Sequence, residues 1–178
     1  MDRYQVDSIK DGGKVYFMIR HKDDMSIVIA PTKYLKHMTK SNRSPYTVRR
    51  IAYSLMFYLG FLEENQITAG DVFEMKYDAH YVHFTDFLSY IKSGRHTDGK
   101  KVSCPSNATC NAYLRDVFGW FAFLELQEET HGSLKVLESH QVTFTNPVGL
   151  KFSIARRTFR GFLREDGHIG RTIERKLH

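Results

Sequence analysis

Cysteine is scarce in this sequence, which contains only Cys104 and Cys110, with five residues between them. A structural zinc site needs four ligands, usually supplied as two close pairs of residues, and no second pair accompanies these cysteines. We therefore expect two reduced thiols, no metal ion and no cofactor.

Long apolar runs are also missing. No stretch of eighteen or more apolar residues occurs, and the first thirteen residues have no apolar segment of the kind found in signal peptides. These absences argue against a membrane partner and predict an intracellular, cytoplasmic protein. The composition still allows a folded core, because 42% of the residues are hydrophobic and thirteen Phe and ten Tyr are present.

Acidic residues are absent from the stretch between residues 25 and 62, although the net charge of the whole chain is only +6. Six basic residues lie in this stretch, namely Lys33, Lys36, Lys40, Arg43, Arg49 and Arg50. Residues 63–91 hold six acidic residues against one lysine, and the chain is basic again over 92–115 and from residue 151 onward. This segregation predicts one basic face directed at a polyanion, whereas ordinary solvated surface is the simpler explanation of any single cluster.

The spacing of apolar and turn residues predicts a small β element followed by a helical body. Strands are expected at 3–9 and 14–20, joined by a glycine turn, with 25–30 as the candidate for a third strand. Helices are expected over 31–40, 45–64, 78–94, 107–126 and 152–165, with a short helix or turn at 67–75 and a strand at 141–145. In the helix over 78–94 we expect Val82, Phe87 and Leu88 to face inward.

The predicted fold class is therefore mainly α, a bundle of four to five helices with a short N-terminal β-hairpin or three-stranded element. We divide the chain into a small β element at 1–30, a helical domain at 31–165 and a basic linker at 166–178. Trp120 is expected in the core of the helical domain.

Two long stretches echo each other sixty-two residues apart. "SPYTVRRIAYSLMFYLGFLEE" (44–64) and "SNATCNAYLRDVFGWFAFLEL" (106–126) both place Ser three positions before Thr and both carry Phe-Leu-Glu near the end. Buried helices share apolar stripes, but a capped helix start also directs backbone N–H groups and the positive end of the helix dipole outward, where phosphate binds. Lys40 and Arg43 precede one start, and Lys100 and Lys101 precede the other. We therefore expect two helix starts side by side on a polyanion, with simple capping as the alternative.

The same segments resemble a known family. "YLKHMTKSNRSPYTVRRIAYSLMFYLGFLEE" (34–64) resembles the opening of the core-binding, or SAM-like, domain of phage-integrase-type tyrosine recombinases, and "SNATCNAYLRDVFGWFAFLE" (106–125) resembles the fourth helix of that domain. The resemblance implies a helical domain that closes over double-stranded DNA at a recombination (attachment) site. It also implies other recombinase protomers as partners in a synaptic complex of the full-length protein, and a bacterial or phage-derived, nucleoid-associated protein.

By position, the resemblance implies two sets of DNA contacts and we add further basic residues. The first set is Lys40, Arg43, Ser44, Thr47, Arg49 and Arg50. The second set is Ser106, Asn107, Thr109, Asn111 and Arg115. The added basic residues are Lys100, Lys101, Arg156, Arg157 and Arg160.

Catalysis is not expected from this chain. The family's catalytic domain supplies a tyrosine nucleophile together with Arg, Lys and His residues that stabilise the transition state. His168 and Arg171 match an H-x-x-R motif, but the last tyrosine is Tyr113, and only seven residues follow Arg171. We expect a DNA-binding part of a recombinase whose catalytic domain is absent here.

Two other functions remain open at this point. A helical protein–protein interaction module would use the aromatic helices and the acidic block for a protein partner, with no role for nucleic acid. A metal enzyme would use His80 and His83, whose H-x-x-H spacing puts both imidazoles on one helix face. Packed structural histidines explain that spacing more simply.

Overall fold

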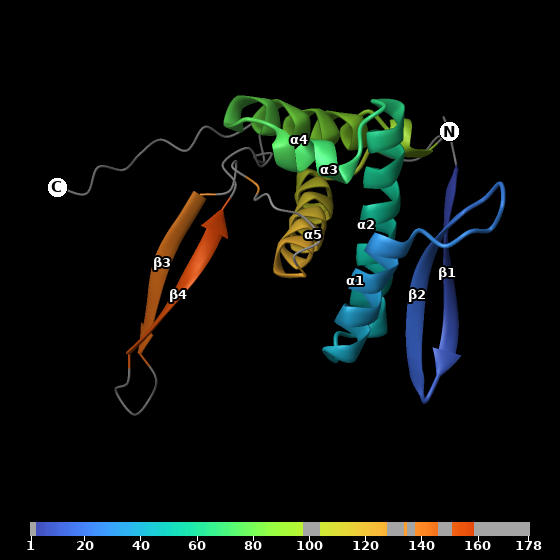
Figure 1. The fold of residues 1–178 in the computed structure, drawn as a ribbon, viewed down its shortest axis with the longest axis horizontal. Coiled ribbons are helices and arrows are strands. Elements are labelled where there is room, and N and C mark those ends of the chain that lie inside the picture. Colours follow the sequence, from blue (N-terminus) through green and yellow to red (C-terminus); the bar gives the residue numbers. More distant parts are fainter. Residues whose placement is uncertain (1–2, 98–103, 128–133, 135–137, 146–150, 159–178) are drawn as a thin grey trace.

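The computed structural model describes residues 3–97, 104–127, 134, 138–145 and 151–158 (Figure 1). The chain forms β1 (Tyr4–Asp11), β2 (Lys14–His21), α1 (Ile29–Lys40), α2 (Pro45–Glu64), α3 (Ala69–Glu74), α4 (Tyr77–Lys92), a 3-10 helix η1 (Arg95–Thr97), α5 (Asn107–Leu126), β3 (Glu138–Thr145) and β4 (Lys151–Thr158). The described part is mainly helical and begins with a two-stranded antiparallel hairpin, which confirms the predicted class at this level. None of the described helices is long and apolar enough to cross a membrane.

The N-terminal hairpin pairs Tyr4 with His21 at one end and Asp11 with Lys14 at the other. Gly12 and Gly13 form its turn with φ values of 52° and 75°, a left-handed conformation that glycine adopts without strain. The middle of β2 is buried against α1 and α2, with Ile19 fully buried. The hairpin is thus packed on the helical body.

The candidate third strand at 25–30 is wrong. Only an isolated bridge joins Arg20 and Ile27, and α1 already begins at Ile29. The reason lies in Pro31, which has no N–H to donate to a strand ladder but fits the first turn of a helix, where N–H groups need no partner in the helix. The helix therefore begins two residues earlier than predicted.

The helix predicted over 152–165 is also wrong where it is described. Lys151–Thr158 forms β4, which pairs antiparallel with β3 and places Ile154 opposite Val142 and Phe152 opposite Phe144. Apolar residues two positions apart fit a strand as well as a short helix, and the partner strand decides between them. β3 confirms the strand expected at 141–145. The rest of the predicted helix and the linker at 166–178 lie outside the described residues.

The core of the helical body is built around Tyr58 of α2, which is fully buried. Its ring lies at centroid distances of 5.0 Å from Phe87 of α4, and 5.8 Å and 6.3 Å from Phe121 and Trp120 of α5. Tyr58 and Trp120 occupy equivalent positions in the echoing segments, so the two helices meet through the same position of their shared apolar pattern. Trp120 is in the core, as expected.

The apolar stripe of α4 differs from the prediction at one residue. Phe87 and Leu88 are fully buried, but Val82 is 54% exposed, while His83 and Phe84 face inward in its place. One residue turns a helix by about 100°, so a stripe centred on 80, 84, 87 and 91 leaves position 82 on the solvent side. His80 and His83 belong to the buried side of the helix.

The contacts of His80 and His83 confirm that they are packed structural residues. His83 Nε2 lies 2.7 Å from the Tyr58 hydroxyl, and His80 Nε2 contacts the backbone carbonyl of Val72 in α3. Both side chains are buried. Within the described residues, no three His, Cys, Asp or Glu side chains gather closely enough to hold a metal ion.

Burial, and to a smaller degree the neighbouring His80, lowers the pKa of His83 from 6.5 to about 4. In the unfolded chain His83 is therefore protonated below about pH 6.5. In the folded chain it stays neutral until the pH falls to about 4. The stability from neutral His83 is present above pH 6.5 and is lost as the pH falls toward 4, a loss of about 3 kcal/mol for such a shift.

Urea unfolding from pH 7 to pH 4 should show this loss in the wild type and in Tyr58→Phe. The double variant Tyr58→Phe/His83→Phe removes both ends of the hydrogen bond and should lose the part of the pH dependence that belongs to His83. If the free energy of unfolding of the double variant falls with pH as steeply as that of the wild type, the pH dependence belongs to groups other than His83.

Candidate nucleic-acid interface

The helices α2 and α5, which carry the echoing segments, cross in opposite directions. Arg50 and Ser54 of α2 both reach Asp116 of α5, and Phe57, further along α2, contacts Tyr113, which lies earlier in α5. Figure 1 shows the same opposite directions. The two helix starts therefore lie on opposite sides of the crossing. The expectation that they sit side by side is wrong. Matching caps determine where each helix begins, but the packing of the two helices determines in which direction each one runs.

The two caps themselves have the same geometry. Ser44 Oγ lies 3.2 Å from the Thr47 amide and 2.9 Å from the Thr47 hydroxyl, and Ser106 Oγ makes the same two contacts with Thr109 at the same distances. Pro45 at the first position of α2 has no N–H at all. Simple capping accounts for the repeated Ser and Thr, because their hydroxyls already serve the helix starts.

Asn107 and Asn111, two polar residues of the predicted second set, are engaged or buried within the fold. Lys92, in the last turn of α4, donates to the Asn107 side-chain oxygen at 2.8 Å and to the Pro105 carbonyl at 3.0 Å. Asn111 is only 8% exposed. Arg115 is exposed on α5. Of the second predicted set, Arg115 is therefore the exposed cation, whereas Asn107 and Asn111 are not available as a row of hydrogen-bond donors to phosphate.

The structure also places the added basic residues only in part. Arg156 and Arg157 lie on β4, at the register positions opposite His140 and Ser139. Lys100, Lys101 and Arg160 lie outside the described residues.

Arg50 differs from its neighbours because it is tied to α5. Its guanidinium Nη2 lies 3.0 Å from Asp116 Oδ1, and the Ser54 hydroxyl donates to Asp116 Oδ2 at 2.7 Å. Asp116 is 8% exposed. Burial raises the pKa of the Asp116 carboxyl, while the Ser54 hydrogen bond and the Arg50 charge act in the opposite direction. Arg50 therefore stabilises a buried carboxylate at the helix crossing, a role that the sequence does not distinguish from phosphate binding.

The remaining basic residues of the acid-free stretch are exposed and form what we call the basic end, composed of Lys33, Lys36, Lys40, Arg43 and Arg49. The three lysines lie three and four positions apart on α1, on the side away from the core. Burial and the Asp116 carboxylate raise the pKa of Tyr34 to about 12, and the charge of Arg43 opposes this shift. The charge of Arg43 thus acts on Tyr34 of α1.

A groove between α2 and α5 adjoins the basic end and was missed by the sequence analysis. It is lined by Tyr46, Arg49, Arg50, Tyr53, Phe57 and Tyr113 and encloses about 350 Å³. The signal was present, since the α2 aromatics recur at 46, 53 and 57, beside the core stripe that contains Ile51, Leu55 and Tyr58. Tyr46 is 82% exposed.

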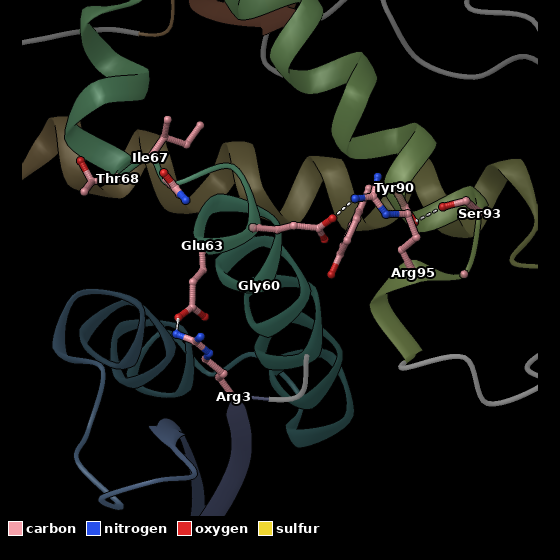
Figure 2. Close-up of a pocket in the computed structure, with 11 residues that line it drawn as sticks. Arg3, Gly60, Glu63, Ile67, Thr68, Tyr90, Ser93 and Arg95 are labelled. Carbon is pink, nitrogen blue, oxygen red and sulfur yellow. Dashed lines mark hydrogen bonds and ion pairs between the residues drawn. The ribbon is translucent and has the colours of Figure 1, made fainter.

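A larger hollow lies near the C-terminal end of α2 and has mixed charge (Figure 2). It encloses about 910 Å³. Arg3, just before β1, pairs with Glu63, and Arg95 of η1 pairs with Glu64 and lies 5.5 Å from the Tyr90 ring centroid. Each arginine faces a glutamate, so this hollow is a poorer anion site than the basic end. Partly exposed ion pairs of this kind contribute about 0–1 kcal/mol each to stability.

Comparison with known proteins adds no assignment, since no family model, curated protein or solved structure matches this chain.

The two neighbouring arginines of α2 should behave differently when truncated. Arg50→Ala leaves the buried Asp116 carboxylate without its cation and should lower the free energy of unfolding by about 1–3 kcal/mol at pH 7. Arg49→Ala, at an exposed position, should change it by less than about 0.5 kcal/mol. Urea unfolding measures both values.

Lowering the pH provides the control, because protonated Asp116 no longer needs a cation. The destabilisation by Arg50→Ala should shrink as Asp116 takes up its proton. Equal effects of the two truncations at pH 7 would contradict the structural role of Arg50.

Proposed function

We propose that this chain binds double-stranded DNA at a recombination site, as the DNA-binding part of a phage-integrase-type tyrosine recombinase. The observation that carries the proposal is the basic end, where five exposed cations lie within a stretch that has no acidic residue from 25 to 62. Phosphate contacts by Lys and Arg dominate the affinity of proteins for duplex DNA.

The proposed mode of binding differs from one that rests on two paired helix starts. The caps of α2 and α5 lie on opposite sides of the crossing, so a single duplex contact is assigned to the basic end alone. Lys36 and Lys40 of α1, Arg43 before α2 and Arg49 in α2 would contact successive phosphates. Ser44 would act indirectly, because its cap determines where α2 begins and so where Arg43 and Arg49 lie.

The SAM-like core-binding fold belongs to the same proposal. The order of a short helix α1, a long capped helix α2, a long helix α4 and a second long capped helix α5 supports this part of the proposal, with the six-residue α3 between α2 and α4. Contacts with other recombinase protomers would belong to the full-length protein. No catalytic residue is assigned to this chain.

One observation favours a second candidate, a protein-interaction module. Met25, Ile27 and Ile29 are 47%, 47% and 65% exposed beside the start of α1. A shallow hollow there is lined by Ile27, Ile29, Thr32, Lys33 and Lys36. An apolar patch next to two of the basic-end lysines would suit a protein partner, and the DNA experiment separates the two candidates.

The triple variant Lys36→Ala/Lys40→Ala/Arg43→Ala should weaken binding to a labelled duplex. Each lost phosphate contact lowers the slope of log K against log salt by about 0.9, so three contacts lower it by about 3. Fluorescence anisotropy across a salt series measures both affinity and slope, with random and candidate attachment-site duplexes compared.

The matched control is Lys10→Ala/Lys22→Ala/Lys76→Ala, which removes the same charge from exposed positions on the hairpin and beside α4. This control should retain most of the wild-type affinity and slope. Equal losses in the two triple variants would leave only a net-charge effect, and no duplex binding at low salt would favour the interaction module.

A further inference from the structure

The groove between α2 and α5 combines aromatic rings and guanidinium groups in one place. Three of its aromatic residues, Tyr46, Tyr53 and Phe57, come from α2, and Tyr113 comes from α5. Within the part of the chain that the structure describes, two arginines and no acidic residue line it. At about 350 Å³, it falls within the range of about 300–1,000 Å³ that is typical of small-molecule sites.

The rings of the groove are held by their neighbours. Phe57 lies at centroid distances of 5.6 Å from Tyr113 and 4.7 Å from His96 of η1. Tyr53 lies 6.3 Å from Phe57 on the next turn of α2, and the Arg49 guanidinium lies 5.7 Å from the Tyr53 centroid. Aromatic rings held in this way lose little conformational freedom when a flat ligand stacks on them.

The two arginines differ in a useful way. Arg50 is fixed by the buried Asp116, so its guanidinium lines the groove in one position. Arg49 is exposed and belongs to the basic end as well as to the groove. A strand whose phosphates contact the basic end would therefore bring its bases toward the groove.

We propose that this groove binds an unstacked nucleobase of a single-stranded segment, with Tyr53 as the stacking platform and Tyr46 at the open side. Every base has a flat π face, so stacking of this kind tolerates different sequences, and a positively charged rim binds the backbone. A base inside a duplex cannot enter the groove, so the ligand is a single strand or a base turned out of the stack. The inference rests on the proposed function only in one respect, namely that phosphate contacts at the basic end bring the strand to the groove. Binding of a base in the groove does not itself require a duplex.

The test uses a short single-stranded oligonucleotide that contains 2-aminopurine, a base whose fluorescence is quenched when it stacks. Wild-type protein should bind it and quench it. Tyr53→Ala should weaken binding by about 5- to 100-fold and abolish the quenching, because stacking on one ring accounts for an effect of this size. Tyr53→Trp keeps a stacking surface and should restore both signals.

The matched control is Tyr77→Ala, which removes a 44% exposed tyrosine from the first position of α4, away from the groove. It should leave affinity and quenching unchanged. Thermal melting of each variant shows whether it is folded, and Tyr46→Ala, at an 82% exposed position, provides a second groove variant that is independent of packing.

The outcomes separate the inference from the proposed function. Duplex binding without single-strand binding, single-strand binding without quenching, or equal effects of Tyr53→Ala and Tyr77→Ala would each overturn the inference. Duplex binding would still support the proposed function in these cases. Quenching that depends on Tyr53, without any duplex binding, would support the groove and refute the duplex proposal.

Discussion

The buried carboxylate of Asp116 at the crossing of α2 and α5 is the constraint on which the rest of the arrangement depends. A charge at an 8% exposed position is tolerable only with partners, and Ser54 and Arg50 supply a hydrogen bond and a cation. Both partners come from α2, so Asp116 fixes the point at which α5 contacts α2. The opposite directions of the helices then place their capped starts apart and bring Phe57 beside Tyr113.

The two ends of α2 carry charges of opposite sign. The first half of α2 and the whole of α1 carry exposed cations, and the last turn of α2 carries Glu63 and Glu64. Those glutamates are paired with Arg3 and Arg95, which come from the hairpin side and from η1. At the C-terminal end of α2 the acidic residues are thus matched by arginines within the molecule, whereas the basic end lies in a stretch of sequence that has no acidic residue. This contrast supports a polyanion as ligand more strongly than the modest net charge does.

The sequence was informative where a local rule decides the structure. Ser44 and Ser106 cap their helices as the S-x-x-T pattern predicts, and the two glycines after Asp11 form the hairpin turn. The apolar stripes of α2 and α5 also follow directly from helical spacing. The sequence was less informative for Lys151–Thr158, because a short apolar pattern suits both a helix and a strand until a partner strand is known.

For the candidate site, the sequence by itself determined which residues carry charge, that acids are excluded from 25–62, and where the long helices begin. Those properties depend on residue type and on neighbours within about one helical turn. Only the tertiary structure decided that Arg50 is committed to Asp116 while Arg49 is exposed, that the two caps lie apart, and that Tyr53 and Tyr113 line one groove. These properties depend on contacts between residues some sixty positions apart in the chain, and such contacts are set by how α2 and α5 pack rather than by any local pattern.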